Sequence, residues 1–212
     1  MAEIIPAILT NDPSELSAKL DSLIGLTEWV QIDIMDGRFV PQISISLDQL
    51  SRLNSPFQFD VHLMVNNPEQ YLEGCQTANV KRVLFQLEGT EDPEAVLSAM
   101  SIHGFERGIA LRPQTPVEAI QPYLSWVTVV LLLSVEPGKQ GQAFIPETIE
   151  RIKQLRQIAP EVKIEVDGGI NADNIAEVAA AGADYLVVGS AIVGQPSPAA
   201  ALNELKAKIN GQ

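Results

Sequence analysis

The stretch VQIDIMDG, residues 30–37, decides the fold. Its valine and isoleucine residues predict a strand that is buried on both faces, as in a parallel sheet covered by helices. On such a strand the carboxylate of Asp33 is costly unless it has a partner or a chemical role. The turn signal at residues 36–37 places Asp33 near the end of that strand.

Two later stretches share this design. In IEVDGGI, residues 164–170, an apolar run delivers Asp167 into a Gly-Gly turn, and DVHLM, residues 60–64, carries His62, one of only two histidines. If the three strands are neighbours in one parallel sheet, these side chains and Asp33 converge at its C-terminal edge. Two carboxylates and an imidazole there predict an acid/base pair with a divalent metal between them.

A plainer interpretation applies to single aspartates at strand ends, which are most often helix N-caps or turn formers. We prefer that interpretation for Asp36 and Asp60. Three polar groups at the ends of separate strands are harder to explain as independent caps. For Asp33, His62 and Asp167 together, the functional interpretation is therefore favoured.

The composition predicts a globular protein with a sizeable core, because 46% of the 212 residues are apolar. A net charge of -13 argues against binding to nucleic acid or to anionic membranes. The single cysteine, Cys75, excludes an internal disulfide, and we expect it to be a small buried hydrophobe. With no signal peptide and no apolar run long enough to span a bilayer, the chain is expected to be cytoplasmic.

One pattern recurs along the chain: an apolar run, a polar loop, a proline just inside an amphipathic stretch, then a turn. Proline suits the first helical position because its missing N–H costs nothing there. The predicted strands cover residues 4–9, 29–34, 57–64, 82–87, 107–111, 127–133, 163–166 and 185–188. The predicted helices cover residues 13–24, 47–53, 93–103, 146–158 and 172–181, and others begin near residues 68, 116 and 198.

Eight such units, with no change of composition that would mark a linker, predict a single (β/α)8 barrel domain over residues 1–212. A doubly wound open sheet is the alternative. Against it, the first strand is not followed by the G-x-G-x-x-G turn that binds dinucleotides. A barrel places its active site at the C-terminal ends of the strands, which is where Asp33, His62 and Asp167 fall.

Three turns in the second half of the chain are rich in glycine. Glycine lets backbone N–H groups approach an anion closely, and barrels often bind phosphate after strands seven and eight. The pattern G-x-x-x-x-G-K-[ST] is absent, so a nucleoside triphosphate is not favoured. The predicted phosphate-binding residues are Gly138, Gly141, Gly168, Gly169, Gly189 and Ser190.

Taken together, these motifs resemble the ribulose-phosphate 3-epimerase family. The matching stretches, in the family's order, are DIMDGRFVP (33–41), DVHLM (60–64), SVEPG with a following GQ (134–142), EVDGGI (165–170) and GSA (189–191). The resemblance covers essentially the whole chain. It implies a barrel of the phosphate-binding type that interconverts D-ribulose 5-phosphate and D-xylulose 5-phosphate.

The resemblance also implies roles for particular residues. Asp33 and Asp167 would remove a proton from one face of the carbon beside the ketone and return one to the other face, through a planar enediolate. A divalent metal (zinc, manganese, iron or magnesium) would be held by these two residues, by His62 and, where the family has a histidine, by Gln31. Met35 and Met64 match methionines that shield the enediolate from water.

The chain departs from the family's pattern at several positions near the site. An amide oxygen is a poorer ligand than imidazole for zinc-like ions, so the metal is expected to be weakly bound, absent or a harder cation. The departures are Ala7, Gln31, Gln86, Leu133, Lys139 and Gln140, of which Lys139 could reach a phosphate.

Several functions are compatible with these residues. The first is an epimerase acting on ribulose 5-phosphate or a related phosphorylated ketose, and the second is a phosphosugar-binding pseudoenzyme. The third, a keto-sugar-phosphate decarboxylase, is disfavoured because the Asp-x-Lys-x-x-Asp signature lacks its lysine after Asp33. The retained Asp33 and Asp167 favour the enzyme. A homo-oligomer is expected, with no nucleic-acid or membrane partner.

Overall fold

Eight parallel strands form a closed barrel in the order β1-β2-β3-β4-β5-β6-β7-β8, and β1 pairs with β8 to complete the ring. The computed structural model describes residues 2–139 and 141–211. It confirms the predicted (β/α)8 barrel and excludes the open sheet. The strands are β1 (Glu3–Ile8), β2 (Trp29–Met35), β3 (Gln58–Met64), β4 (Arg82–Gln86), β5 (Glu106–Leu111), β6 (Val129–Leu133), β7 (Lys163–Asp167) and β8 (Tyr185–Val188).

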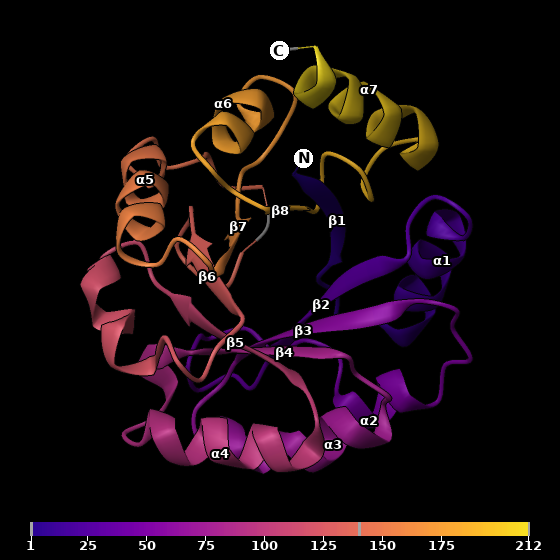
Figure 1. Ribbon diagram of the computed structural model, residues 1–212. Helices are drawn as coiled ribbons and strands as arrows, with labels where there is room; N and C mark the ends of the chain where they lie inside the picture. Colours follow the sequence, from indigo (N-terminus) through magenta and orange to yellow (C-terminus); the bar gives the residue numbers. More distant parts are fainter. Residues whose placement is uncertain (1, 140, 212) are drawn as a thin grey trace.

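Helices surround the barrel as an outer ring, in which α7 lies beside α1 (Figure 1). Three of them begin with the expected proline, and Asp12, Asp92 and Ser197 cap them by accepting backbone N–H groups. The α-helices are α1 (Pro13–Leu23), α2 (Leu47–Ser51), α3 (Leu72–Thr77), α4 (Pro93–His103), α5 (Thr148–Ile158), α6 (Ile175–Ala180) and α7 (Pro198–Asn210). Short 3-10 helices are η1 (Pro68–Tyr71), η2 (Leu87–Gly89) and η3 (Val117–Tyr123).

The segment after Pro116 differs from its prediction, because η3 replaces the expected α-helix. Pro122 lies inside it and cannot donate an i to i−4 hydrogen bond, which favours the tighter helix. None of the helices in residues 2–139 and 141–211 is long and apolar enough to cross a bilayer.

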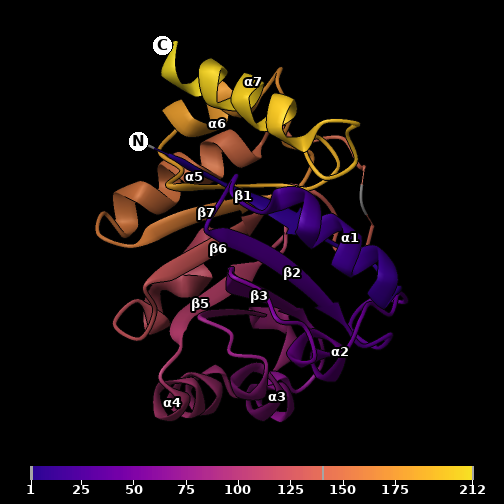
Figure 2. The same ribbon diagram turned by 90° about the vertical axis from the view of Figure 1, so that its right-hand side faces the viewer.

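Alternate residues of each strand face outward and inward. The outward residues pack against the helices in the main apolar core, to which Ile32 and Val61 belong. A smaller apolar cluster fills the barrel between the strands, with Leu84 and Leu131 among its members. Figure 2 shows the same barrel from the side, with its strands running between two ends. Polar inward residues therefore lie in layers above and below the small cluster.

The lower layer contains an ion-pair network that we call the floor cluster: Arg82, Asp60 and Glu165. Arg82 is 2% exposed, and its Nη1 lies 2.8 Å from Asp60 Oδ2 and 3.3 Å from Glu165 Oε2. The rings of Trp29 and Tyr185 flank the guanidinium at 4.5 and 4.4 Å. The prediction that Asp60 is a helix cap or turn former is therefore wrong. Asp60 is a buried ion-pair partner within β3.

Candidate active site

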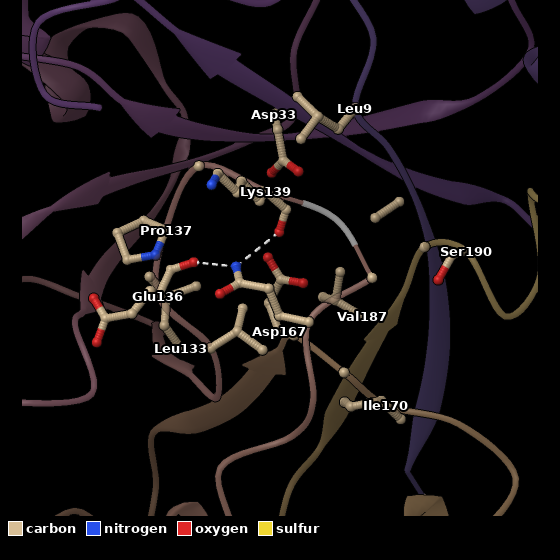
Figure 3. Close-up of a pocket in the computed structure, with 18 of the residues that line it drawn as sticks. Leu9, Asp33, Leu133, Glu136, Pro137, Lys139, Asp167, Ile170, Val187 and Ser190 are labelled. Carbon is tan, nitrogen blue, oxygen red and sulfur yellow. Dashed lines mark hydrogen bonds between the residues drawn. The ribbon is translucent and has the colours of Figure 1, made fainter. Parts of the chain in front are cut away.

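A cavity of about 370 Å³ lies at the C-terminal ends of the strands, where a barrel places its chemistry. Figure 3 shows the carboxylates of Asp33 and Asp167 pointing into it. Asp33 comes from β2 and Asp167 from β7, so strands distant in sequence supply the two acids. The register pairs Asp33 with His62 of β3, which brings the imidazole into the same layer.

Gln31 joins the two carboxylates. Its Nε2 donates hydrogen bonds to Asp33 Oδ1 at 3.1 Å and to Asp167 Oδ2 at 3.2 Å. Gln31 is fully buried, and its Oε1 has no hydrogen-bond partner among the described residues. One buried amide thus bridges the two carboxyl groups.

His62 lies between the same two carboxylates. Its Nδ1 is 3.3 Å from Asp33 Oδ1 and 3.8 Å from Asp167 Oδ2, and its Nε2 is 2.7 Å from Nε2 of Gln86. Gln86 is also fully buried, and its Oε1 lacks a described partner. The two amides of the site therefore contact the acids on one side and the imidazole on the other.

The electrostatics of the site follow from burial and proximity. Burial raises the pKa of Asp33, and the charge of Asp167 adds to that effect, while His62 opposes it. Burial alone would lower the pKa of His62, but the adjoining carboxylates of Asp167 and Asp33 outweigh it and raise the pKa to about 9. A buried carboxylate with a raised pKa is better suited to accept and return a proton than an exposed one.

The donor set fits a divalent cation. Asp33, His62 and Asp167 each offer one ligand atom, and these atoms lie within 4.8 Å of one another. The unpartnered Oε1 of buried Gln31, two residues before Asp33 on β2, is a fourth potential ligand. Two carboxylates, an imidazole and an amide oxygen form a mixed set, more oxygen-rich than typical zinc sites.

The Gly-Gly turn after β7 is held open by several side chains. Gly168 and Gly169 have φ angles of 121° and 65°, and a Cβ on Gly169 would meet Phe144 N at 2.5 Å. Ser134 donates its hydroxyl hydrogen bond towards Gly168 O at 2.6 Å and Asp167 O at 2.9 Å. The sequence indicates Ser134 only as part of the SVEPG motif, so its role in fixing this turn was not predicted.

Glycine turns supply backbone donors to the cavity. The N–H groups of Gly168, Gly169, Ser190 and Ala191 make no backbone hydrogen bond within the described part of the chain. All four residues line the cavity, as do Gly138, Gly141 and Gly189. The structure thus brings together all six residues that were predicted to bind phosphate.

The loop after β6 closes one side of the cavity. Gln142 Nε2 donates to Glu136 O at 2.6 Å and to Lys139 O at 2.9 Å, as drawn in Figure 3. Lys139 is the one lysine or arginine among the described lining residues. Gln140 lies outside the residues that the structure describes.

Met35 and Met64 form the apolar wall that was predicted. They are 3% exposed, pack with Val40, and line the cavity next to Asp33. Ala7 and Leu133, two positions of departure, line the same cavity. The wall places apolar side chains next to Asp33 in the cavity.

Asp36 is a turn former, as predicted. Its Oδ1 accepts hydrogen bonds from the N–H groups of Arg38 at 2.8 Å and Phe39 at 2.9 Å, and its Oδ2 accepts one from Asn66 at 2.9 Å. These bonds outweigh burial and lower its pKa. Cys75 is buried, also as predicted.

Comparison with known proteins gives matches over the whole barrel. A sequence profile described as the ribulose-phosphate 3 epimerase family matches residues 3–193. The cytoplasmic isoform of ribulose-phosphate 3-epimerase from Oryza sativa subsp. japonica is 36% identical, over 99% of this chain and 95% of that protein. The ribulose-phosphate 3-epimerase of Escherichia coli is 32% identical, over 97% of this chain and 95% of that protein.

Solved structures share the fold at lower identity. A 3-hexulose-6-phosphate synthase superimposes with a TM-score of 0.73 at 18% identity, over 98% of this chain and 99% of that one. Orotidine 5'-phosphate decarboxylase from Pyrococcus horikoshii gives 0.70 at 16% identity, over 99% and 100% of the two chains. These likenesses show the barrel fold alone.

Proposed function

The chain belongs to the ribulose-phosphate 3-epimerase family, and on that premise we propose that it interconverts D-ribulose 5-phosphate and D-xylulose 5-phosphate. The observation that carries the proposal is the convergence of Asp33 and Asp167 on one amide, at 3.1 and 3.2 Å, inside a cavity lined by unpaired backbone donors. A keto-sugar phosphate needs an acid/base pair at one end and an anion site at the other.

The two aspartates exchange protons with carbon 3 of the sugar. In one direction the carboxylate of one residue takes the proton, which leaves a planar enediolate, and the carboxyl group of the other delivers a proton to the opposite face. The raised pKa of Asp33 favours its role as the base that removes the proton, because a weaker acid has a more basic conjugate form. Reversal of these roles gives the reverse reaction.

A divalent cation held by Asp33, His62, Asp167 and Gln31 Oε1 would supply Lewis-acid stabilisation of the enediolate oxygen. The amide oxygen in place of an imidazole favours a harder cation, magnesium or manganese, over zinc. Met35 and Met64 exclude water from the intermediate, which would otherwise be protonated at random.

The phosphate group lies at the glycine turns. The N–H groups of Gly168, Gly169, Ser190 and Ala191 bind its oxygens, and Gly138 and Gly141 shape the loop on the opposite side. The N–H donors bind the anion without a cluster of basic residues, so the site suits an acidic protein. Lys139 adds a single positive charge at the edge of the cavity.

The test is proton NMR of D-ribulose 5-phosphate with the protein in deuterated water, with and without a chelator. The proposal expects deuterium at carbon 3 together with the appearance of xylulose 5-phosphate. Binding of the sugar phosphate without exchange would instead identify a phosphosugar-binding protein, the candidate that the departures at Gln31 and Gln86 favour. Exchange on a different ketose phosphate would keep the mechanism and change the substrate.

A further inference from the structure

The loop between β2 and α2 carries part of the apolar wall of the active site. Its tip is residues 38–42, and Val40 of this tip is buried against Met35 and Met64. The base of the loop is fixed to β2, because Met35 N donates to Ser44 Oγ at 2.9 Å and Ser44 N donates to Met35 O at 3.3 Å. What holds the tip therefore decides where this part of the wall lies.

Most of the hydrogen bonds of the tip stay within the loop. The N–H groups of Arg38 and Phe39 both donate to Asp36 Oδ1. Within residues 2–139 and 141–211, the one hydrogen bond to the tip from another segment comes from Arg112, whose Nη2 lies 3.4 Å from Phe39 O. The guanidinium also covers the ring of Phe39, with Cζ 4.1 Å from the ring centroid. A cation in this position is attracted by the face of the ring as well as by the carbonyl oxygen.

Arg112 is itself anchored at the end of β5 by its backbone. Its N–H donates to Glu88 Oε1 at 3.1 Å, and its carbonyl oxygen accepts from Arg151 Nη2 at 2.8 Å. Arg151 of α5 also donates to Leu133 O at 3.2 Å, at the end of β6. These bonds do not use the side chain of Arg112, so they persist when that side chain is replaced.

We propose that Arg112 is a positioning residue that holds the loop tip in place through the ring and the carbonyl oxygen of Phe39, a contact that we call the clamp. Arg112 is not among the described residues that line the cavity, so it acts through the loop and not on the substrate. The clamp keeps Val40 packed on Met35 and Met64. The inference rests on the proposed function for the reaction that is assayed, although the position of the tip can be measured without turnover.

Two substitutions of Arg112 separate its charge from its bulk. Methionine is unbranched and packs well on an aromatic ring, but it has neither the charge nor the donors. Lysine keeps the charge and lacks the planar guanidinium. Arg112→Met should therefore loosen the tip, and Arg112→Lys should restore part of the hold. The matched control is Arg52→Met, at an exposed arginine after α2 that pairs with Asp48 at 2.7 Å.

Trypsin measures the position of the tip without turnover. Arg38 is exposed, so a loosened tip should be cut between Arg38 and Phe39. The bond after Arg112 is resistant from the start, because proline follows it. Cleavage after Arg38 should be about 5- to 30-fold faster in Arg112→Met than in wild type, and cleavage at other sites should keep its rate. Arg52→Met should be cut after Arg38 at the wild-type rate.

Kinetics test whether the tip matters to the reaction, with the same divalent cation present in every assay. Arg112→Met should lower kcat on the order of tenfold and leave the Kd for D-ribulose 5-phosphate within about twofold of wild type. The Kd is expected to persist because the glycine turns are untouched. Arg112→Lys should recover part of kcat, and Arg52→Met should match wild type in both quantities.

The outcomes separate the clamp from its rivals. An unchanged rate of cleavage after Arg38 in Arg112→Met would overturn the inference. A raised Kd with a wild-type kcat would also overturn it, because Arg112 would then be a substrate-binding residue, and so would faster cleavage with no loss of kcat. Faster cleavage in Arg112→Met, in a protein whose wild type has no turnover, would keep the clamp and remove the proposed function instead.

Discussion

Asp33 is a carboxylate with almost no access to solvent, on a strand whose neighbouring residues are apolar. It is 7% exposed, and burial raises its pKa. A residue in this environment is expensive to keep unless its charge is used or compensated. Asp167 lies beside it, bridged by the same amide of Gln31, so the prediction at the scale of single residues concerns these two acids.

Asp33→Asn and Asp167→Asn should each reduce proton exchange at carbon 3 by about 10²- to 10⁴-fold, because each removes one of two groups that move a proton. Binding of the sugar phosphate should persist, since the glycine turns are untouched. Deuterium incorporation followed by NMR measures the first and calorimetric titration the second. The control is Asp21→Asn, at an exposed position of α1. Full exchange in either variant would exclude that residue from acid/base chemistry.

The role of a single residue could be predicted from sequence where its position at the end of a strand was sufficient. Asp33, His62 and Asp167 follow apolar runs, and this placed them at one edge of the sheet. Asp60 was assigned wrongly because its partner, Arg82, lies on another strand. A signal was present, since Asp60 and His62 are two residues apart on one strand and therefore share the inward face.

At the scale of elements, the Gly-Gly turn after β7 connects the barrel to the proposed phosphate site. Its prediction from sequence was correct in kind, but its supports were not visible there. Asn174 donates to Gly169 O from the segment that directly follows the turn, but Ser134 donates to Gly168 O from the position that follows the preceding strand, β6. Contacts of this kind depend on how loops pack, which local pattern does not encode.

Gly169→Ala should destabilise the protein by about 1–3 kcal/mol and raise the KM for the sugar phosphate, because the left-handed backbone and the 2.5 Å contact with Phe144 N both oppose a methyl group. Gly25→Ala is the matched control. Gly25 has a φ of 78° with nothing within 4 Å of an added Cβ, so it should lose stability from backbone strain without a change in KM. Equal KM effects in both variants would argue against the proposed phosphate turn.

A second prediction on this scale concerns the junction of β7 and β8. Asp184 accepts hydrogen bonds from Ile164 N at 3.0 Å and from Lys163 Nζ at 2.9 Å, and it pairs with Arg156. Burial would raise its pKa, but these partners outweigh burial and lower the pKa below the ordinary 3.8. Its ionised form therefore stabilises the fold above that pH, and the stabilisation is lost as the pH falls through the lowered pKa.

Asp184→Asn should cost about 1 kcal/mol of unfolding free energy at pH 7, a modest value because the group is partly exposed. The difference from wild type should shrink as the pH falls below about 4. Urea unfolding at a series of pH values measures it. A difference that stays constant down to pH 2 would show that the charge of Asp184 contributes nothing.

On the scale of the whole molecule, the floor cluster combines a buried positive charge with two buried carboxyl groups. Burial raises the pKa of Asp60 to about 6, and burial together with the charge of Asp60 raises the pKa of Glu165 well above its ordinary value. The sequence predicted the barrel from its eight repeated units, but it did not predict this interior, since its members come from β3, β4 and β7. The repeating pattern of strands and helices determines the architecture, but it does not determine which side chains fill the barrel interior.

Arg82→Met should destabilise the protein by about 3–5 kcal/mol, because it leaves two buried carboxyl groups without their partner. The triple variant Arg82→Met, Asp60→Asn, Glu165→Gln removes those charges and should recover part of the loss. Urea unfolding of the three proteins at pH 7 gives both numbers. No recovery in the triple variant would show that the two buried carboxyl groups are not the cause of the loss, which would then come from the packing of the guanidinium between Trp29 and Tyr185 and from its ion pair with Glu106 at 2.8 Å.

The floor cluster also closes one end of the barrel. Arg82, held between the rings of Trp29 and Tyr185, fills the end opposite the cavity, so the interior is closed on that side. Substrate and product must then use the same opening. One of them must leave before the other can enter. Under the proposed function, the two pentose phosphates therefore act as competitive inhibitors of each other, and their concentration ratio sets the net flux.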